Sequence, residues 1–399
     1  MLTKQELQQL LNEGLATGAD FSEIFLEDTK TEVIRITSGE VTQIDRGNTY
    51  GAGIRLILGV DEVYGYTNDV SYDSLFKVIS NLRASFNGNI KQAQPLGEAK
   101  PIKSVIKKPM GSVPVEEKTS ILQKLSNIIK SYDARIVQAI SQLIETEQKV
   151  LIVNSEGIYQ NDLRAHTRGI LMAVAQENGN MQQAYEGPGR SMGFELFEEI
   201  DFEALAQEVA QSAITLLSAE DMVPQVMPVV LHNGFGGVIF HEACGHPLEA
   251  TAVAKGLSPF VGKIGEKIGS DVVTAYDNGY VEGAWGSASF DDEGKPTQNN
   301  LLIENGVLKG YLIDYRNGRK MNMDPTGSAR RQSYKFSPTS RMNSTFIAPG
   351  KDKFEDIIKD TKYGLFAKKL GGGTVVPATG EFNFAVQEGY MIEDGKLTT

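Results

Sequence analysis

TEVIRITSGEVTQID, residues 31–45, contains two strand-like runs with a short turn sequence between them. Ser38 and Gly39 supply the turn chemistry that joins antiparallel neighbours. The stretch therefore predicts a β-hairpin. The segments around it repeat the pattern, with strand-like runs at FSEIFLED (21–28), AGIRLIL (52–58) and EVYGYT (62–67) and turn-like sequences at RGN (46–48) and GVDE (59–62). Together they predict an antiparallel meander.

Helical patterns and a second set of strands complete the N-terminal half. Leu7, Leu10 and Leu11 have the spacing of an amphipathic helix over residues 3–17. Further helices are expected near 71–85, over 115–132 and over 203–219, and further strands at IVQAISQLIETEQ (136–148), KVLIVNSEG (149–157) and RAHTRGILMAVAQ (164–176). The order predicts an α+β domain over residues 1–220, in which helices pack on antiparallel sheets.

Short strands and tight turns dominate the C-terminal half, residues 221–399. LLIENGVLKG (301–310) and YMIEDGKLTT (390–399) each carry an Asn-Gly or Asp-Gly pair between strands, the signature of a type I′ hairpin. We therefore expect a domain rich in antiparallel β-hairpins. The second hairpin stops at Thr399, part-way into its returning strand, so we expect a further C-terminal segment in the natural protein.

Composition limits the classes of function. The net charge of −12, from 39 basic and 51 acidic residues, disfavours binding to nucleic acid. The start of the chain has no secretory signal, and no apolar run approaches the length that a bilayer needs. A single cysteine fits a reducing compartment. These features predict a cytoplasmic protein without a membrane span.

HEACGHPLEA, residues 241–250, is a candidate metal-binding motif. It differs from the H-E-x-x-H motif of zinc proteases because its second histidine comes one residue late. On a regular helix, positions i and i+4 differ by about 40° and positions i and i+5 by about 140°. His241 and His246 can therefore share a metal ion only if the helix widens between them, for example as a π-bulge.

The local sequence permits that distortion. Residues 227–231 are expected to form a strand that turns into a helix, with Asn233 at the N-cap. Gly245 has low helix propensity and Pro247 interrupts the backbone hydrogen bonds. Widening the helix at this point therefore costs little free energy. We predict His241 and His246 as metal ligands and Glu242 as the general base. The alternative is that both histidines are ordinary polar residues at a helix end.

Catalytic zinc usually has three protein ligands, so one more is needed. Cys244 is a local candidate, although it could equally be a small buried hydrophobe. Glu249, three residues beyond the second histidine, is another. His166 and His232 are expected in structural or solvent-facing roles.

Several long blocks resemble the TldD/PmbA family, on its TldD side. HEACGHPLEA is followed by blocks similar to the family in the same order, at residues 284–314 (AWGSASFDDEGKPTQNNLLIENGVLKGYLID), 326–350 (TGSARRQSYKFSPTSRMNSTFIAPG) and 371–397 (GGGTVVPATGEFNFAVQEGYMIEDGKL). The N-terminal half is also similar to the family's first domain. The resemblance therefore covers nearly the whole chain.

The resemblance implies a zinc-dependent peptidase that acts on unfolded or flexible peptides. It implies a homodimer, or a heterodimer with a PmbA/TldE-like subunit. It also implies that the third zinc ligand is a cysteine downstream of Thr399. Because that ligand is not in this sequence, a non-catalytic partner or scaffold subunit is the alternative function. Hydrolysis of a non-peptide bond is a third possibility, since zinc and a carboxylate suit other acyl transfers. Arg331 or Tyr334 could stabilise an oxyanion, although structural roles are the simpler interpretation.

Overall fold

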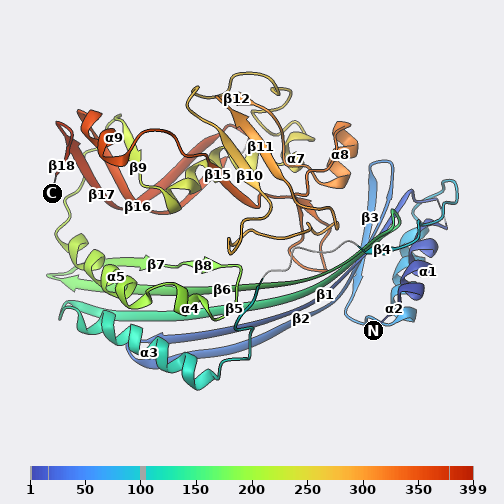
Figure 1. Cartoon of the computed structure of the whole chain (residues 1–399), viewed down its shortest axis with the longest axis horizontal. Helices are drawn as coiled ribbons and strands as arrows, with labels where there is room; N and C mark the ends of the chain where they lie inside the picture. Colours follow the sequence, from blue (N-terminus) through green and yellow to red (C-terminus); the bar gives the residue numbers. More distant parts are fainter. Residues whose placement is uncertain (1, 17, 99–104, 377, 399) are drawn as a thin grey trace.

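The structure is a computed structural model that describes residues 2–16, 18–98, 105–376 and 378–398. Among these residues, the N-terminal half forms one long, curved sheet of eight strands (Figure 1). Its strands are β1 (Phe21–Thr37), β2 (Glu40–Leu58), β3 (Asp61–Thr67), β4 (Gly97–Glu98), β5 (Ile136–Asn154), β6 (Ile158–Glu177), β7 (Asn180–Glu186) and β8 (Gly189–Arg190). The strand order is β3-β2-β1-β5-β6-β4, and β7 and β8 also pair with β6. The predicted antiparallel meander is β1-β2-β3.

The predicted hairpin turns have the expected backbone. Ser38 and Gly39 have φ angles of 49° and 87°, and Asn305 and Gly306 have 47° and 79°. Positive φ at both central residues defines a type I′ turn, whose twist matches that of the strands it joins. The Asp-Gly turn at 394–395 repeats this geometry. These three turn predictions are therefore confirmed.

Two expectations about the strands were wrong. RGN, predicted as a turn, lies inside β2, where Gly47 pairs opposite Thr31. The Arg46 guanidinium forms a cross-strand ion pair of 2.7 Å with Glu32, which favours the extended backbone there. The second correction concerns the number of sheets. The two strand sets form a single sheet, because β1 pairs with β5 along nearly its whole length.

The helices pack on one face of this sheet. Ile24 of β1 lies in a buried cluster with α1 and α2, and Ile34 lies in another with α3. Side chains alternate along a strand, so these two even-numbered residues point to the same face. The helices that cover this face are α1 (Lys4–Leu15) and α2 (Tyr72–Arg83) at one end, and α3 (Val115–Ser131) and α5 (Phe202–Leu217) at the other, with the short α4 (Leu196–Glu199) beside them. The predicted helices are confirmed.

The C-terminal half lies over the opposite face of the sheet (Figure 1). It contains a four-stranded sheet of β9 (Val229–Leu231), β16 (Tyr363–Val376), β17 (Glu381–Glu393) and β18 (Lys396–Leu397). A second sheet has β10 (Ala275–Asn278), β11 (Asn299–Glu304), β12 (Val307–Leu308) and β15 (Ser344–Ile347), and a smaller pair has β13 (Ala329–Arg330) and β14 (Thr339–Ser340). The helices are α6 (Val238–Phe240), α7 (Ala250–Val253), α8 (Tyr315–Met321) and α9 (Phe354–Asp360). No helix of the described residues is both long and apolar enough to cross a membrane.

Buried charges join the two halves. Arg55 of β2 is fully buried and forms ion pairs of 2.7 Å with Glu23 of β1 and with Glu293 of the C-terminal half. Arg331, also from the C-terminal half, pairs with the same Glu23. Each charge is removed from water, so each one depends on its partners across the interface.

Arg55→Met should strongly destabilise the protein, because it leaves Glu23 and Glu293 buried with one cation fewer. Breaking such a pair typically costs about 3–5 kcal/mol. The matched control is Lys124→Met, which removes an exposed ion pair with Glu203. This variant should leave the midpoint of urea unfolding nearly unchanged. Urea unfolding of both variants measures the difference. Equal midpoints for the two would show that the buried pairs do not hold the halves together.

Candidate metal centre

The HEACGH motif lies in one helical run whose hydrogen-bond pattern changes along its length. The run is α-helical over Val238–Phe240, π-helical over His241–Gly245 and 3₁₀-helical over His246–Leu248. The backbone N–H of His246 donates to the carbonyl of His241, which is the i to i+5 bond of a π-turn. The predicted widening of the helix between the two histidines is confirmed.

Gly245 and Pro247 explain why the widening occurs here. A Cβ atom on Gly245 would lie 2.0 Å from Sδ of Met342, so only glycine lets the helix pack this closely against that side chain. Pro247 stands in the first turn of the 3₁₀ segment, where its missing N–H costs no helical hydrogen bond. A 3₁₀ turn over Gly234–Gly237 precedes these segments and starts after Asn233, as predicted, but the Asn233 side chain makes no capping hydrogen bond.

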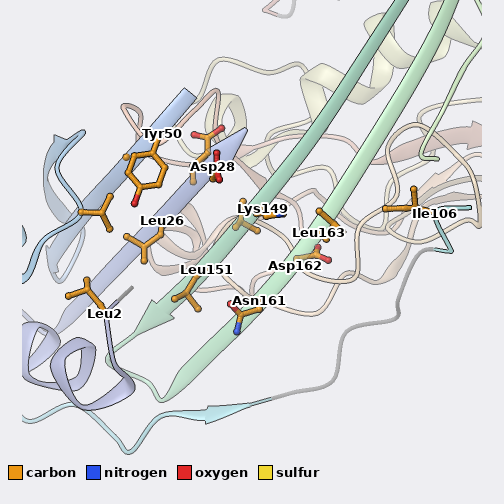
Figure 2. A pocket seen from close by; sticks show the side chains of 14 residues that line it. Leu2, Leu26, Asp28, Tyr50, Ile106, Lys149, Leu151, Asn161, Asp162 and Leu163 are labelled. Atoms are coloured by element: carbon orange, nitrogen blue, oxygen red, sulfur yellow. The ribbon is translucent and has the colours of Figure 1, made fainter. Parts of the chain in front are cut away.

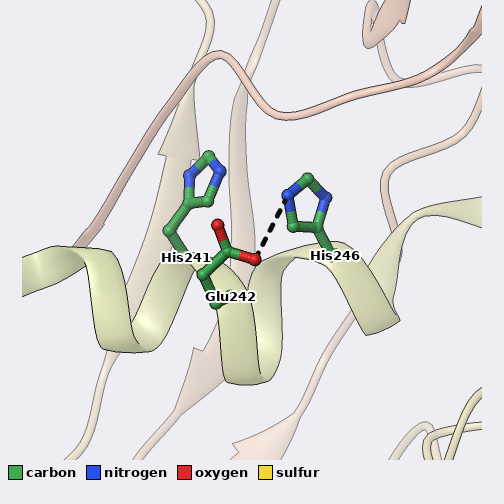
Figure 3. Close-up of side chains that lie close together, drawn as sticks. All are labelled: His241, Glu242 and His246. Atoms are coloured by element: carbon green, nitrogen blue, oxygen red, sulfur yellow. Dashed lines mark ion pairs between the residues drawn. The ribbon is translucent and has the colours of Figure 1, made fainter. Parts of the chain in front are cut away.

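The π-turn brings the three predicted side chains together. The ligand atoms of His241, Glu242 and His246 all lie within 4.8 Å of one another. The two imidazole rings are 4.8 Å apart and nearly perpendicular, and the Glu242 carboxylate lies 3.7 Å from Nε2 of His246. Figure 3 shows the three side chains projecting from the same side of the helix. Two imidazoles and a carboxylate in this arrangement suit a divalent metal ion.

Burial prepares the first histidine for a metal. Removal from water lowers the pKa of His241, and the neighbouring His246 lowers it further. The imidazole is therefore neutral at physiological pH, which is the form that binds metals. The local environment thus favours ligation over protonation.

Glu249 orients His246. Its Oε1 atom lies 3.0 Å from Nδ1 of His246, and this contact leaves Nε2 to face Glu242. The backbone of Glu249 is fixed by a parallel bridge to Leu312, and its side chain lies 3.8 Å from Arg341. A carboxylate in this position sets the tautomer and direction of a metal-binding histidine. The structure therefore places Glu249 behind a predicted ligand and outside the group of three that could hold an ion.

Cys244 has the surroundings of a core residue. It packs against the buried cluster that contains Leu248 and Met342, and burial raises the pKa of its thiol. Thiolate, and not thiol, is the metal ligand. Cys244 is not in the ligand group that the described residues form. Of the two roles considered for Cys244, metal ligand and small buried hydrophobic residue, its position suits the second.

The remaining predicted residues lie elsewhere. The His232 ring contacts Asn233 and Phe366 near the start of the run. Arg331 and Tyr334 are occupied at the interface between the halves, where Arg331 pairs with Glu23 and the Tyr334 backbone donates to Glu27. The third ligand expected downstream of Thr399 lies outside the described residues and stays a prediction.

Sequence reasoning missed Arg341, Met342 and Leu312, which support the site from behind. They are remote from the motif along the chain and contact it only through folding. No local pattern marks them. The register of the Leu312 segment against residues 248–250 places Leu312, whereas Met342 and Arg341 are placed by their contacts with Gly245 and Glu249.

Comparison with protein families gives three matches in chain order. Residues 22–86 match domain 1 of the PmbA/TldA metallopeptidases, residues 108–217 match their central domain, and residues 224–399 match their C-terminal domain. The last range contains the π-turn with its two histidines and its glutamate.

Curated relatives align over the full length of the chain. A metalloprotease TldD homolog of Haemophilus influenzae is 32% identical over 410 residues, which cover 100% of this chain and 84% of that protein. A metalloprotease of Methanocaldococcus jannaschii is 31% identical, with 100% and 88% covered. A Saccharolobus solfataricus protein named zinc metalloprotease TldD homolog is 24% identical, with 95% and 84% covered.

Solved structures share the fold. A crystal structure from Thermotoga maritima has a TM-score of 0.83 at 21% identity and covers 99% of this chain and 89% of that one. TldE from Thermococcus kodakarensis has a TM-score of 0.76 at 20% identity, with 98% and 89% covered. The arrangement of both halves is therefore shared with proteins of low sequence identity.

His166 generates a prediction about pH. Its Nε2 atom contacts the carbonyl of Trp285 across the interface, and burial lowers the pKa of its imidazole to about 4. The unfolded pKa is about 6.5, so the folded state binds fewer protons and loses stability as pH falls from 6.5 towards 4. At pH 5 the loss relative to pH 7 is up to about 2 kcal/mol.

His166→Gln keeps a side-chain donor but cannot titrate. The variant should therefore lose less stability than the parent protein between pH 7 and pH 5, as measured by urea unfolding at both values. His232→Gln, at an exposed histidine, is the matched control. If the free energy of unfolding depends on pH in the same way in His166→Gln and in the parent protein, His166 is not the source of the pH dependence.

Proposed function

The chain belongs to the PmbA/TldD metallopeptidase family, and on this basis we propose that it is a zinc-dependent peptidase that cleaves unfolded or flexible peptides. The observation that carries the proposal is the π-turn, which brings His241, Glu242 and His246 within 4.8 Å of one another. The name of the Saccharolobus relative supports zinc as the metal.

His241 and His246 would hold the ion, since their imidazole nitrogens lie close together and imidazole nitrogen is a typical zinc ligand. When bound, Zn²⁺ lowers the pKa of a water molecule and polarises the carbonyl of the scissile bond. Glu242 takes a proton from the attacking water at its carboxylate and delivers it to the leaving amine nitrogen. Glu249 holds the His246 ring in the productive orientation throughout.

An extended peptide would dock by adding a strand to the sheet that contains β17. Within the described residues, β18 pairs only with Ile392 and Glu393 of that strand, so the outer edge of the rest of β17 has no strand partner. β17 also contacts the π-turn. Backbone pairing tolerates many sequences but requires an extended, unfolded substrate.

We also propose that the chain works as a homodimer, or as a heterodimer with a PmbA/TldE-like subunit. The fold shared with TldE from Thermococcus kodakarensis is compatible with a related partner. The alternative function, a non-catalytic partner or scaffold subunit, predicts a folded chain without bound zinc.

The proposed function is tested by bound zinc and peptidase activity in three proteins. The parent protein should retain zinc after dialysis. Glu242→Gln should also retain it but lose about 10²–10⁴-fold in activity, because the general base is removed and the ligands stay. His241→Ala should lose zinc and activity together. A folded parent protein that binds no zinc and shows no activity on added zinc would support the scaffold alternative.

A second comparison separates the two neighbours of the motif. Glu249→Gln should weaken zinc binding by about 10–100-fold, because the contact that orients His246 is altered. Cys244→Ala should leave zinc affinity within about twofold, since the thiol packs in a core cluster. Competition with a zinc chelator measures both affinities. A larger loss of zinc affinity in Cys244→Ala than in Glu249→Gln would indicate that Cys244 is a ligand and that Glu249 does not support the site.

A further inference from the structure

A cavity of 620 Å³ lies on the helix-bearing face of the long sheet (Figure 2). The strand register places Tyr50, Asp28, Lys149 and Leu163 in one row across β2, β1, β5 and β6. Directly opposite residues share a face, and Asp28 has the same parity as Ile24, which packs against α1 and α2. The cavity is therefore on the face away from the C-terminal half and its metal centre.

The lining is mainly apolar. Leucines of adjacent strands form the floor, and segments that lead into helices form the rim. The apolar residues include Leu2, Leu26, Val70, Ile106, Leu151 and Leu163. The volume falls within the range of about 300–1,000 Å³ that small-molecule sites occupy. Tyr50 is 49% exposed and Leu163 is 41% exposed, so large apolar surface remains open to solvent beside the cavity.

Three acidic residues, Glu27, Asp28 and Asp162, line this space, and of the two on β1, Asp28 points to the helix-bearing face. The Oδ1 atom of Asp28 is buried and has no hydrogen-bond partner among the described residues. Lys149 stands opposite it on β5, but its ammonium is paired with Glu147 at 3.9 Å. A buried carboxylate oxygen without a donor is costly, and a charged donor compensates it best.

We propose that this cavity binds an amphiphilic organic amine. Its ammonium group pairs with the carboxylate of Asp28, and its apolar body packs on Leu26 and Leu151. The site does not depend on the proposed peptidase function, because the next residue of β1, Glu27, points to the opposite face and accepts a hydrogen bond from Tyr334 of the C-terminal half.

Calorimetric titration of the full chain with octylammonium, octan-1-ol and octanoate tests the charge preference. The amine should bind at least tenfold more tightly than the alcohol, and octanoate should bind most weakly. Asp28→Asn should remove the difference between amine and alcohol, and Leu151→Ala should weaken both. Unchanged zinc content in Asp28→Asn shows that the metal centre is intact, so failure here is distinguishable from failure of the proposed peptidase.

The comparison of the amine with the alcohol on the parent protein stands even if a variant fails to fold. Equal affinities for the two probes would overturn the proposal. So would a cavity occupied by a second copy of the chain, which would show as no amine binding and a dimer that Leu163→Glu dissociates. Photo-crosslinking with an aliphatic diazirine amine should label β1 and β5, and labelling confined to the C-terminal half would also reject the site.

Discussion

A fully buried guanidinium, Arg55, is the constraint on which the relation between the two halves depends. Removing its charge from water is expensive, and the cost is offset only when Glu23 from the same sheet and Glu293 from the C-terminal half are both in place. The carboxylate of Glu23 is shared with Arg331, so both halves contribute a cation to it. The halves therefore dock in one register, and that register also sets the position of the candidate metal centre over the sheet.

Features with a local cause could be predicted from the sequence. The turns at Ser38-Gly39 and Asn305-Gly306 follow from residues that accept positive φ, and the helices follow from apolar spacing. The length of the strands could not be predicted in the same way. RGN has turn chemistry, yet pairing with β1 and the contact of Arg46 with Glu32 keep it extended. The partner of each strand lies far along the chain, beyond the reach of a local pattern.

The candidate site shows the same division. The spacing of His241 and His246, with Gly245 and Pro247 beside them, predicts a widened helix, and the π-turn has that form. The role of Glu249 could not be predicted, because its direction depends on the bridge to Leu312. Proximity in sequence made Cys244 an equal candidate. Packing distinguishes Glu249 from Cys244. The Glu249 side chain contacts the His246 ring, whereas the Cys244 side chain packs against the core.

The π-turn packs on the core beneath it. Gly245 is held against Met342, and the residues after Pro247 are joined to the Leu312 segment by backbone hydrogen bonds on both sides of Glu249. π-turns are rare within helices, and here the surrounding contacts hold the widened form. Substitutions in this core are therefore expected to shift the candidate metal ligands without contacting them directly. The packing of residues 312 and 342 therefore helps to set the geometry of the site, as the residues of the motif do.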